Sequence, residues 1–219
     1  MNKNHKATSE KPLTRKRDPE ARRRRLEDAA REEFSARGLE GARVDEIARR
    51  AGVNKQLVYH YFGNKDGLYL RILEQTYEAM VKAKVSLQLQ DIPPFEAIEK
   101  LVGFTFDYIA DHRDFIALIN DENIHKGRHI RKSQHVHPTH SEMMRILDDI
   151  LRAGEKDGSI REGIDTIQFY ITLSGMCYFY FANIHTLSVV FGRDLASAEA
   201  LAVRRTHIID TVLASIRPG

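Results

Sequence analysis

Residues 41–73 read "GARVDEIARRAGVNKQLVYHYFGNKDGLYLRIL", and this stretch decides the fold. Apolar side chains at helical spacing predict one short helix over residues 44–51 and another over residues 54–61, which Asn54 caps. Gly52 marks a tight turn between the two helices. Two short helices that are joined by a glycine-containing turn and follow an amphipathic helix are typical of a helix-turn-helix.

The rest of the chain also predicts helices. Asp18 is a cap residue followed by proline, and Gly38 ends the helix that starts there. Because no alternating strand pattern occurs, we expect an all-α protein of about nine helices. The further helical patterns cover residues 65–89, 95–111, 114–126 and 138–156, and two more run from Asp165 and from Leu195 towards the C-terminus.

Charge is unevenly distributed along the chain. Residues 1–67 carry 17 Lys and Arg against 11 Asp and Glu, whereas residues 68–219 carry 17 against 20. A basic N-terminal part favours a polyanionic partner at that end. The hydrophobic content of 42% is enough for a core, and no apolar run reaches the length of about 18 residues that predicts a membrane span. The single Cys177 and the lack of a secretory signal are typical of a cytoplasmic protein.

The second short helix carries a row of polar and aromatic side chains that packing alone does not require. In a helix-turn-helix, the N-terminal part of the second helix enters the major groove, and Lys55 and Gln56 lie there. Glutamine pairs with adenine, and lysine reaches the acceptors of guanine. Tyr59 and His60, about one turn further on, can contact bases or phosphates. This pattern predicts a DNA-reading helix.

Residues 41–73 resemble the DNA-binding signature of the TetR/AcrR family of one-component regulators. The resemblance covers the turn "AGV", the ring run "LVYHYF" and the entry "NKDGLY" to the following helix. Arg43 stands where relatives usually place a Ser or Thr cap, and a phosphate contact in place of the cap is one explanation. Packing alone is the alternative for Tyr61 and Phe62. The residues that the resemblance places near DNA are Lys55, Gln56, Tyr59 and His60 at the bases, and Tyr61 and Lys65 at the phosphates.

The resemblance also implies the organisation of the chain. It implies a helix-turn-helix DNA-binding domain over residues 18–66 and an effector-binding and dimerisation domain over residues 67–219. Residues 1–17 are polar and lack periodicity, so we expect a flexible basic arm there. Because one helix-turn-helix reads only a few base pairs, a palindromic operator and a homodimer are expected. The family pairs its two C-terminal helices with those of a second copy. The apolar residues expected at that interface are Leu173, Met176, Cys177, Tyr180, Ile184, Leu201, Val203, Ile208, Ile209, Val212 and Leu213.

Polar and aromatic side chains on apolar helical faces predict a small-molecule site in the C-terminal part, although an ordinary place in the core is the alternative for each. The C-terminal part also resembles repressors of catabolic operons, of the type that controls nicotinate degradation and, more distantly, pyrimidine catabolism. That resemblance implies a small aromatic or carboxylate effector that releases a repressor from its operator. The candidate residues share three faces: Phe104, Tyr108 and His112; Asn120 and Asn123; and Tyr178, Phe181 and His185.

Histidines gathered between His125 and His140 offer a second kind of effector. His125 and His129 are spaced to share a metal ion on one helix, which would make the chain a metal-responsive regulator, although Arg128 nearby would repel a cation. A non-specific architectural DNA binder is a third possibility, and it would show no preference for palindromic DNA. Because no phosphate loop, nucleophile elbow or Cys–His pair occurs, we expect neither an enzyme nor a cofactor.

Overall fold

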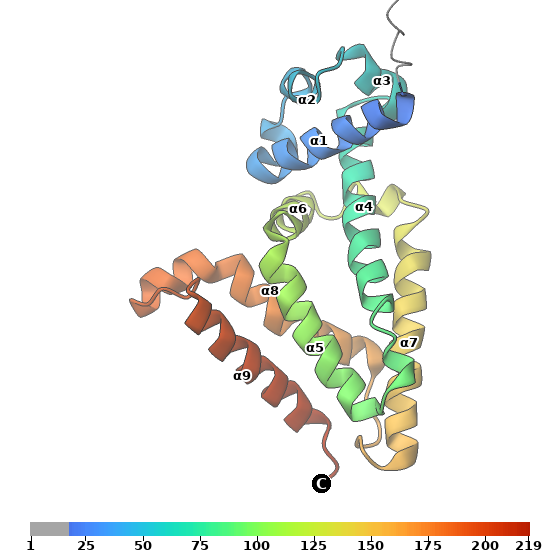
Figure 1. The fold of residues 1–219 in the computed structure, drawn as a ribbon, viewed down its shortest axis with the longest axis vertical. Helices are drawn as coiled ribbons and strands as arrows, with labels where there is room; N and C mark the ends of the chain where they lie inside the picture. The colour runs from blue at the N-terminus through green and yellow to red at the C-terminus, as the bar shows by residue number, and fades with distance from the viewer. Residues whose placement is uncertain (1–17) are drawn as a thin grey trace, which may run out of the picture.

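A computed structural model describes residues 18–219, and helices are the only regular secondary structure over that range, as expected (Figure 1). The expected basic arm, residues 1–17, lies outside the described residues. No helix within residues 18–219 combines the length and apolar character needed to cross a bilayer. The nine α-helices of this range are α1 (Pro19–Gly41), α2 (Val44–Ala51), α3 (Gln56–Phe62), α4 (Lys65–Val85), α5 (Pro94–Asp111), α6 (Arg113–Ile124), α7 (Val136–Asp157), α8 (Thr166–Phe191) and α9 (Ala198–Ile216), with short 3-10 helices η1 (Leu89–Asp91) and η2 (Ile130–Lys132).

The helix starts follow the capping residues in the sequence. The Asp18 carboxylate accepts a hydrogen bond from Glu20 N at 3.0 Å at the start of α1. The Asn64 side chain accepts one from Gly67 N at 2.8 Å at the start of α4. In the turn before α3, the Asn54 side chain accepts one from Gln56 N at 2.9 Å, although regular helix begins only at Gln56. These bonds satisfy amide groups that a helix cannot pair internally.

Two helices end earlier than their patterns predicted. Helix α4 ends at Val85 rather than Leu89, because Gln88 takes a positive φ of 51° and starts η1. Helix α6 ends at Ile124 rather than residue 126, because Lys126 and Gly127 both take positive φ. Positive φ is incompatible with a right-handed helix.

Helices α1 to α3 form one end of the molecule, and α4 leads from them into the remaining helices (Figure 1). The core of this end includes Leu26, Phe34, Ile47 and Val58. From the first half of α4 it includes Leu68, Tyr69, Ile72 and Leu73. Leu118 of α6 is buried in the same core. Helix α4 therefore belongs to both parts of the chain, and the expected division after residue 66 falls within its first turn.

The two parts are joined by hydrogen bonds to Asp121 of α6. Its Oδ2 accepts from Leu39 N at 2.9 Å and from the Tyr69 hydroxyl at 2.8 Å. Leu39 follows Gly38, whose φ of 65° bends the end of α1 towards α6. Burial, and then the hydrogen bond to Asp121, raise the pKa of Tyr69 above its ordinary value, so its hydroxyl stays a donor at physiological pH. One carboxylate thus holds α1, α4 and α6 together.

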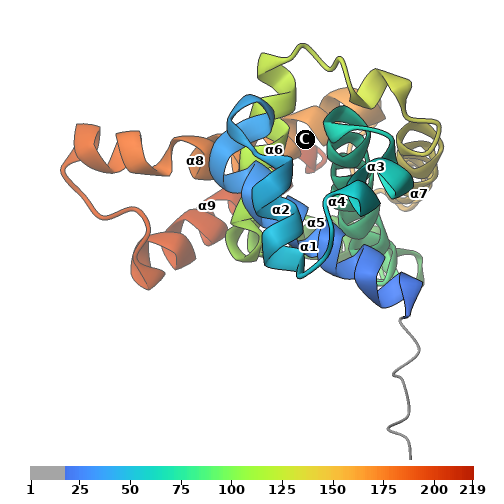
Figure 2. The same ribbon diagram turned by 90° about the horizontal axis from the view of Figure 1, so that it is seen from above.

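Helix α5 is central in the C-terminal part, where it packs against α7, α8 and α9. Helices α8 and α9 form an antiparallel pair, and its loop end projects from the rest of the molecule in both views (Figures 1 and 2). Asp107 of α5 and Arg205 of α9 join the pair to the core through a bidentate ion pair, with contacts of 2.8 and 2.9 Å. The shared core includes Leu101, Phe106 and Leu173.

Most of the residues expected at the dimer interface lie inside a single chain, so the assignment is wrong for those residues. Eight of the eleven are buried in the core of the C-terminal part, and only Val203 is largely exposed. The sequence pattern did not distinguish them because apolar side chains occur on all sides of α8. Val203 on α9, which was expected, is exposed, and the other exposed apolar residues of the pair are Ile167, Ile171, Phe179, Val189, Val190 and Phe191 on α8.

Candidate nucleic-acid interface and ligand cavity

Helix α3 presents a polar and aromatic face to solvent. Val58 is fully buried and Leu57 packs against the same core, which fixes the rotation of the helix. As a result Gln56, Tyr59 and His60 face outwards, and the Tyr59 side chain is 46% exposed. The exposed face therefore presents side chains that can hydrogen-bond and make flat contacts, which is what reading base edges requires.

Lys55 begins this face and already has an anionic partner. Its Nζ lies 2.9 Å from Asp45 Oδ1 of α2, and both side chains are more than half exposed. The hydrogen bond and charge of Asp45 raise the pKa of Lys55 above its ordinary value. A phosphate or base would have to compete with Asp45 for this ammonium group.

The other residues expected at DNA have different surroundings. Arg43 is exposed and gives α2 no side-chain cap, as its departure from Ser or Thr suggested. The Tyr61 ring is half-buried against the core, 5.2 Å from the His60 ring. Lys65 donates to the carbonyl oxygens of Leu39 at 2.7 Å and Ala42 at 3.3 Å. Two of the three protons of its ammonium group are therefore used in hydrogen bonds at the end of α1. Contacts of these residues with phosphate stay predictions.

A cavity of about 680 Å³ lies among α4, α5, α6, α7 and α8, within the usual range of small-molecule sites. Aromatic and aliphatic side chains form most of its wall. Burial raises the pKa of Tyr77 in this wall to about 12, so its hydroxyl stays protonated. The polar lining residues are Lys84, Thr105, Asn123, His140 and Ser174.

The cavity includes only some of the expected ligand residues. Asn123 and Tyr178 line it. Asn120, Phe181 and His185 line a separate cavity of about 410 Å³ between α6 and α8, and the Tyr178 hydroxyl donates to Asn120 Oδ1 between the two. Phe104, Tyr108 and His112 line neither cavity. The His112 ring instead stacks on Tyr108 with 4.0 Å between centroids, at the exposed end of α5.

Lys84 and His140 are cavity residues that the sequence reasoning missed. A signal for Lys84 was present, because it lies three residues after Val81 and seven after Tyr77, on the apolar side of α4. A lysine at such a position is unusual in a helix that only packs. His140 was grouped with its exposed neighbours, although its ring lies 5.3 Å from that of Tyr77.

Two sequence families match the chain. Residues 26–72 match the bacterial regulatory proteins of the tetR family, and residues 94–212 match the tetracyclin repressor-like C-terminal domain. The chain belongs to the TetR family. It is 36% identical to the transcriptional repressor NicS of Pseudomonas putida, over 86% of this chain and 89% of NicS.

Solved structures of two transcriptional regulators share the fold. The ketosteroid transcriptional regulator KstR2 of Mycobacterium tuberculosis is 21% identical with a TM-score of 0.65, over 90% of this chain and 96% of that one. The regulator FadR of Bacillus subtilis, solved with stearoyl-CoA, is 19% identical with a TM-score of 0.64, over 89% of this chain and 100% of that one. TetR-family proteins are transcriptional regulators with a DNA-binding helix-turn-helix, and ligand binding and dimerisation are typical of them.

The histidines of this TetR-family chain do not form the shared metal site of the alternative, metal-responsive interpretation. His125 and His129 are not on one helix, because α6 ends at Ile124. The buried His129 ring hydrogen-bonds through Nδ1 to Glu122 at 2.7 Å, and the His125 ring contacts the Asp121 carbonyl oxygen at 2.8 Å. Between residues 18 and 219, no group of three or more His, Cys, Asp or Glu side chains is arranged to hold a metal ion.

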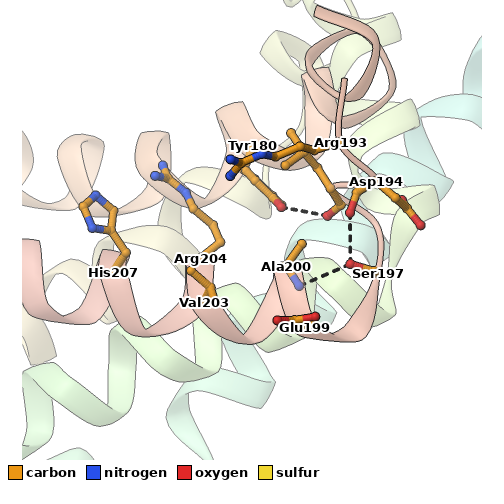
Figure 3. Close-up of a pocket in the computed structure, with 10 residues that line it drawn as sticks. Tyr180, Arg193, Asp194, Ser197, Glu199, Ala200, Val203, Arg204 and His207 are labelled. Carbon is orange, nitrogen blue, oxygen red and sulfur yellow. Dashed lines mark hydrogen bonds between the residues drawn. The ribbon is translucent and has the colours of Figure 1, made fainter. Parts of the chain in front are cut away.

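A third pocket, of about 470 Å³, lies along the α8–α9 pair near its loop end (Figure 3). Arg193, Arg204 and His207 line it, and the Tyr180 hydroxyl donates to the Leu195 carbonyl oxygen at 2.7 Å on its wall. Exposed Val203 of α9 also lines it. None of its lining residues is on α4, so a ligand in this pocket would not contact the helix that connects the two parts of the chain.

Proposed function

We propose that the chain is a repressor that binds a palindromic operator as a homodimer and is released by a small aromatic or carboxylate effector. The observation that carries this proposal is the course of α4. Leu68, Tyr69, Ile72 and Leu73 of this helix are buried in the core that also holds Val58 of the reading helix. Tyr77, Met80 and Lys84, further along, line the 680 Å³ cavity. A single rigid element therefore connects a ligand site with a DNA-binding surface.

The homodimer is supported by the exposed apolar surface of the α8–α9 pair. Val189 is 82% exposed and Phe191 is 62% exposed near the end of α8 that projects from the molecule (Figure 2). Val190 between them is also exposed, and gathered exposed apolar side chains mark interaction sites in proteins. A two-fold axis through the pair would bring α8 and α9 of two copies together as a four-helix arrangement.

The release step follows from the connection through α4. Two reading helices fit successive major grooves when they lie about 34–36 Å apart, one turn of DNA. An effector that favours a different position of α4 would change this separation and weaken operator binding. It must bind the two arrangements with different affinity, since equal affinity shifts no equilibrium.

Selection of bound DNA from a random duplex pool, at physiological salt, tests the proposal. We expect a sequence with two-fold symmetry whose half-sites lie about 10 base pairs, one turn, apart. Recovery of unrelated sequences with equal affinity would instead indicate a non-specific architectural protein.

Sedimentation tests the dimer separately. The parent should sediment as a dimer at micromolar concentration, and Val189→Asp should sediment as a folded monomer, because it places a charge in an apolar interface. A monomeric parent would contradict the homodimer.

A further inference from the structure

The cavity among α4 to α8 contains a buried cation without a counter-ion. Lys84 is only 2% exposed, and its side chain lines the cavity. Over residues 18–219, no carboxylate lies within the 4.0 Å of an ion pair from its Nζ, which lies over the Tyr170 ring, 4.9 Å from its centroid. Burying a charge is unfavourable unless it is paired, so this ammonium group has an unmet requirement for an anion.

Two neutral groups in the same cavity have unused hydrogen-bonding capacity. Ser174 Oγ is buried without a hydrogen bond, and His140 Nδ1 is buried with only a weak contact to the backbone of Val136. Burial, and then the positive charge of Lys84, lower the pKa of His140 below its ordinary value, so the ring is neutral at physiological pH. A neutral imidazole and a hydroxyl can each donate to an oxygen without adding charge. The site therefore combines one positive charge with neutral donors, which suits a single carboxylate.

The remaining wall of the cavity suits a flat ring. Tyr77, Phe115 and Tyr170 line it, and the Tyr77 ring lies 6.5 Å from that of Phe115. Aromatic side chains at such spacings accept a further ring by stacked or edge contacts. No Asp or Glu is among the lining residues, so no side chain of the wall would neutralise the charge of a cationic ligand.

We infer that the cavity binds an aromatic monocarboxylate, with its carboxylate paired to Lys84 and its ring among the aromatic side chains. This inference rests on the proposed function and narrows its effector to one class. A neutral aromatic compound would leave Lys84 unpaired, and a cationic one would be repelled. Because Lys84 is on α4, the ion pair forms on the helix that begins in the DNA-binding part.

Calorimetric titration of the full-length protein tests the inference with benzoate, its ring-hydroxylated and ring-aza analogues, and benzamide as the neutral isostere. The parent and Lys82→Met should bind at least one of the acids and bind benzamide at least about tenfold more weakly than benzoate. Lys82 is a matched control because it lies on the same helix with its side chain 79% exposed. Lys84→Met should weaken binding of that acid at least about tenfold, because it removes the charge at similar volume.

The unliganded Lys84→Met variant should unfold at the same or a higher temperature than the parent, because an unpaired buried charge is removed. Lys84→Gln is measured beside it, so that a folding defect in one variant does not decide the result. Equal binding of benzoate and benzamide, unchanged binding in both Lys84 variants, or binding of none of the acids would overturn the inference.

Operator release, followed separately by fluorescence anisotropy, distinguishes the inference from the proposed function. Acids that bind through Lys84 without releasing DNA would support the inference and contradict the proposed release. Release by a neutral compound, undiminished in both Lys84 variants, would overturn the inference and leave the proposed function in place.

Discussion

The hydrogen bond from Tyr69 to Asp121 gives a quantitative test of how the two parts of the chain are joined. Tyr69 is fully buried, and its hydroxyl donates to the Asp121 carboxylate at 2.8 Å. Tyr69→Phe removes only this hydroxyl and leaves the carboxylate short of one donor. Hydrogen bonds to charged groups contribute about 1.5–3 kcal/mol, so we expect the free energy of unfolding to fall by about that amount. For a chain of this size, the loss corresponds to a melting temperature lower by about 3–12 °C.

Urea unfolding followed by circular dichroism measures this change, with all variants at one protein concentration because dimerisation contributes to stability. Tyr59→Phe is the matched control, since the Tyr59 side chain is 46% exposed, and it should change stability by less than about 0.5 kcal/mol. The double variant with Tyr69→Phe and Asp121→Asn should lose less free energy of unfolding than the sum of the losses in the two single variants. Unaltered stability in Tyr69→Phe, or strict additivity, would refute the idea that this bond joins α4 to α6.

Three further outcomes follow from single contacts. Gly38→Ala should lower the free energy of unfolding by about 1–3 kcal/mol in urea titration. Gly38 has φ 65° and ψ 174°, and a Cβ there would lie 2.6 Å from Asp121 Oδ1. A variant as stable as the parent would contradict this strain. Asp45→Asn should tighten operator binding several-fold in anisotropy titrations at low salt, because it frees Lys55 from its ion pair and removes a negative charge. Weaker binding would argue against a DNA contact by Lys55. Burial raises the pKa of Cys177 to about 12. The thiol of the native protein should therefore react slowly with a disulfide reagent at mildly alkaline pH, and quickly in denaturant. Rapid reaction of the native protein would contradict the buried position.

The helical architecture could be predicted because local signals mark it. Asp18 and Asn64 cap their helices through single short hydrogen bonds, and Gly52 ends α2 in the left-handed conformation that glycine favours. The outward direction of Tyr59 and His60 also follows from the local pattern. Val58 is apolar and faces the core, so the two residues after it on the helix face away from the core. These features depend on residues close together in the sequence.

The cavity and the dimer surface could not be predicted in the same way, because they depend on how distant helices meet. Lys84 of α4, His140 of α7 and Ser174 of α8 all line the cavity. Their positions in the sequence follow no common periodicity that would predict that they meet. The apolar residues of α8 look alike in sequence, yet Cys177 is buried in the core while Phe179 is 57% exposed. Only the packing of α8 against α5, α6, α7 and α9 separates the two sets.

Operator affinity of Tyr59→Ala, compared with the parent and with His137→Ala, tests the role of α3 most directly. His137 is an exposed residue of α7 and serves as the control. If α3 reads the operator, losing one contact of at least about 1 kcal/mol in each half-site weakens binding by the dimer at least about 30-fold, while the melting temperature and the dimer stay unchanged. Parental affinity in Tyr59→Ala would show that this face of α3 does not read DNA.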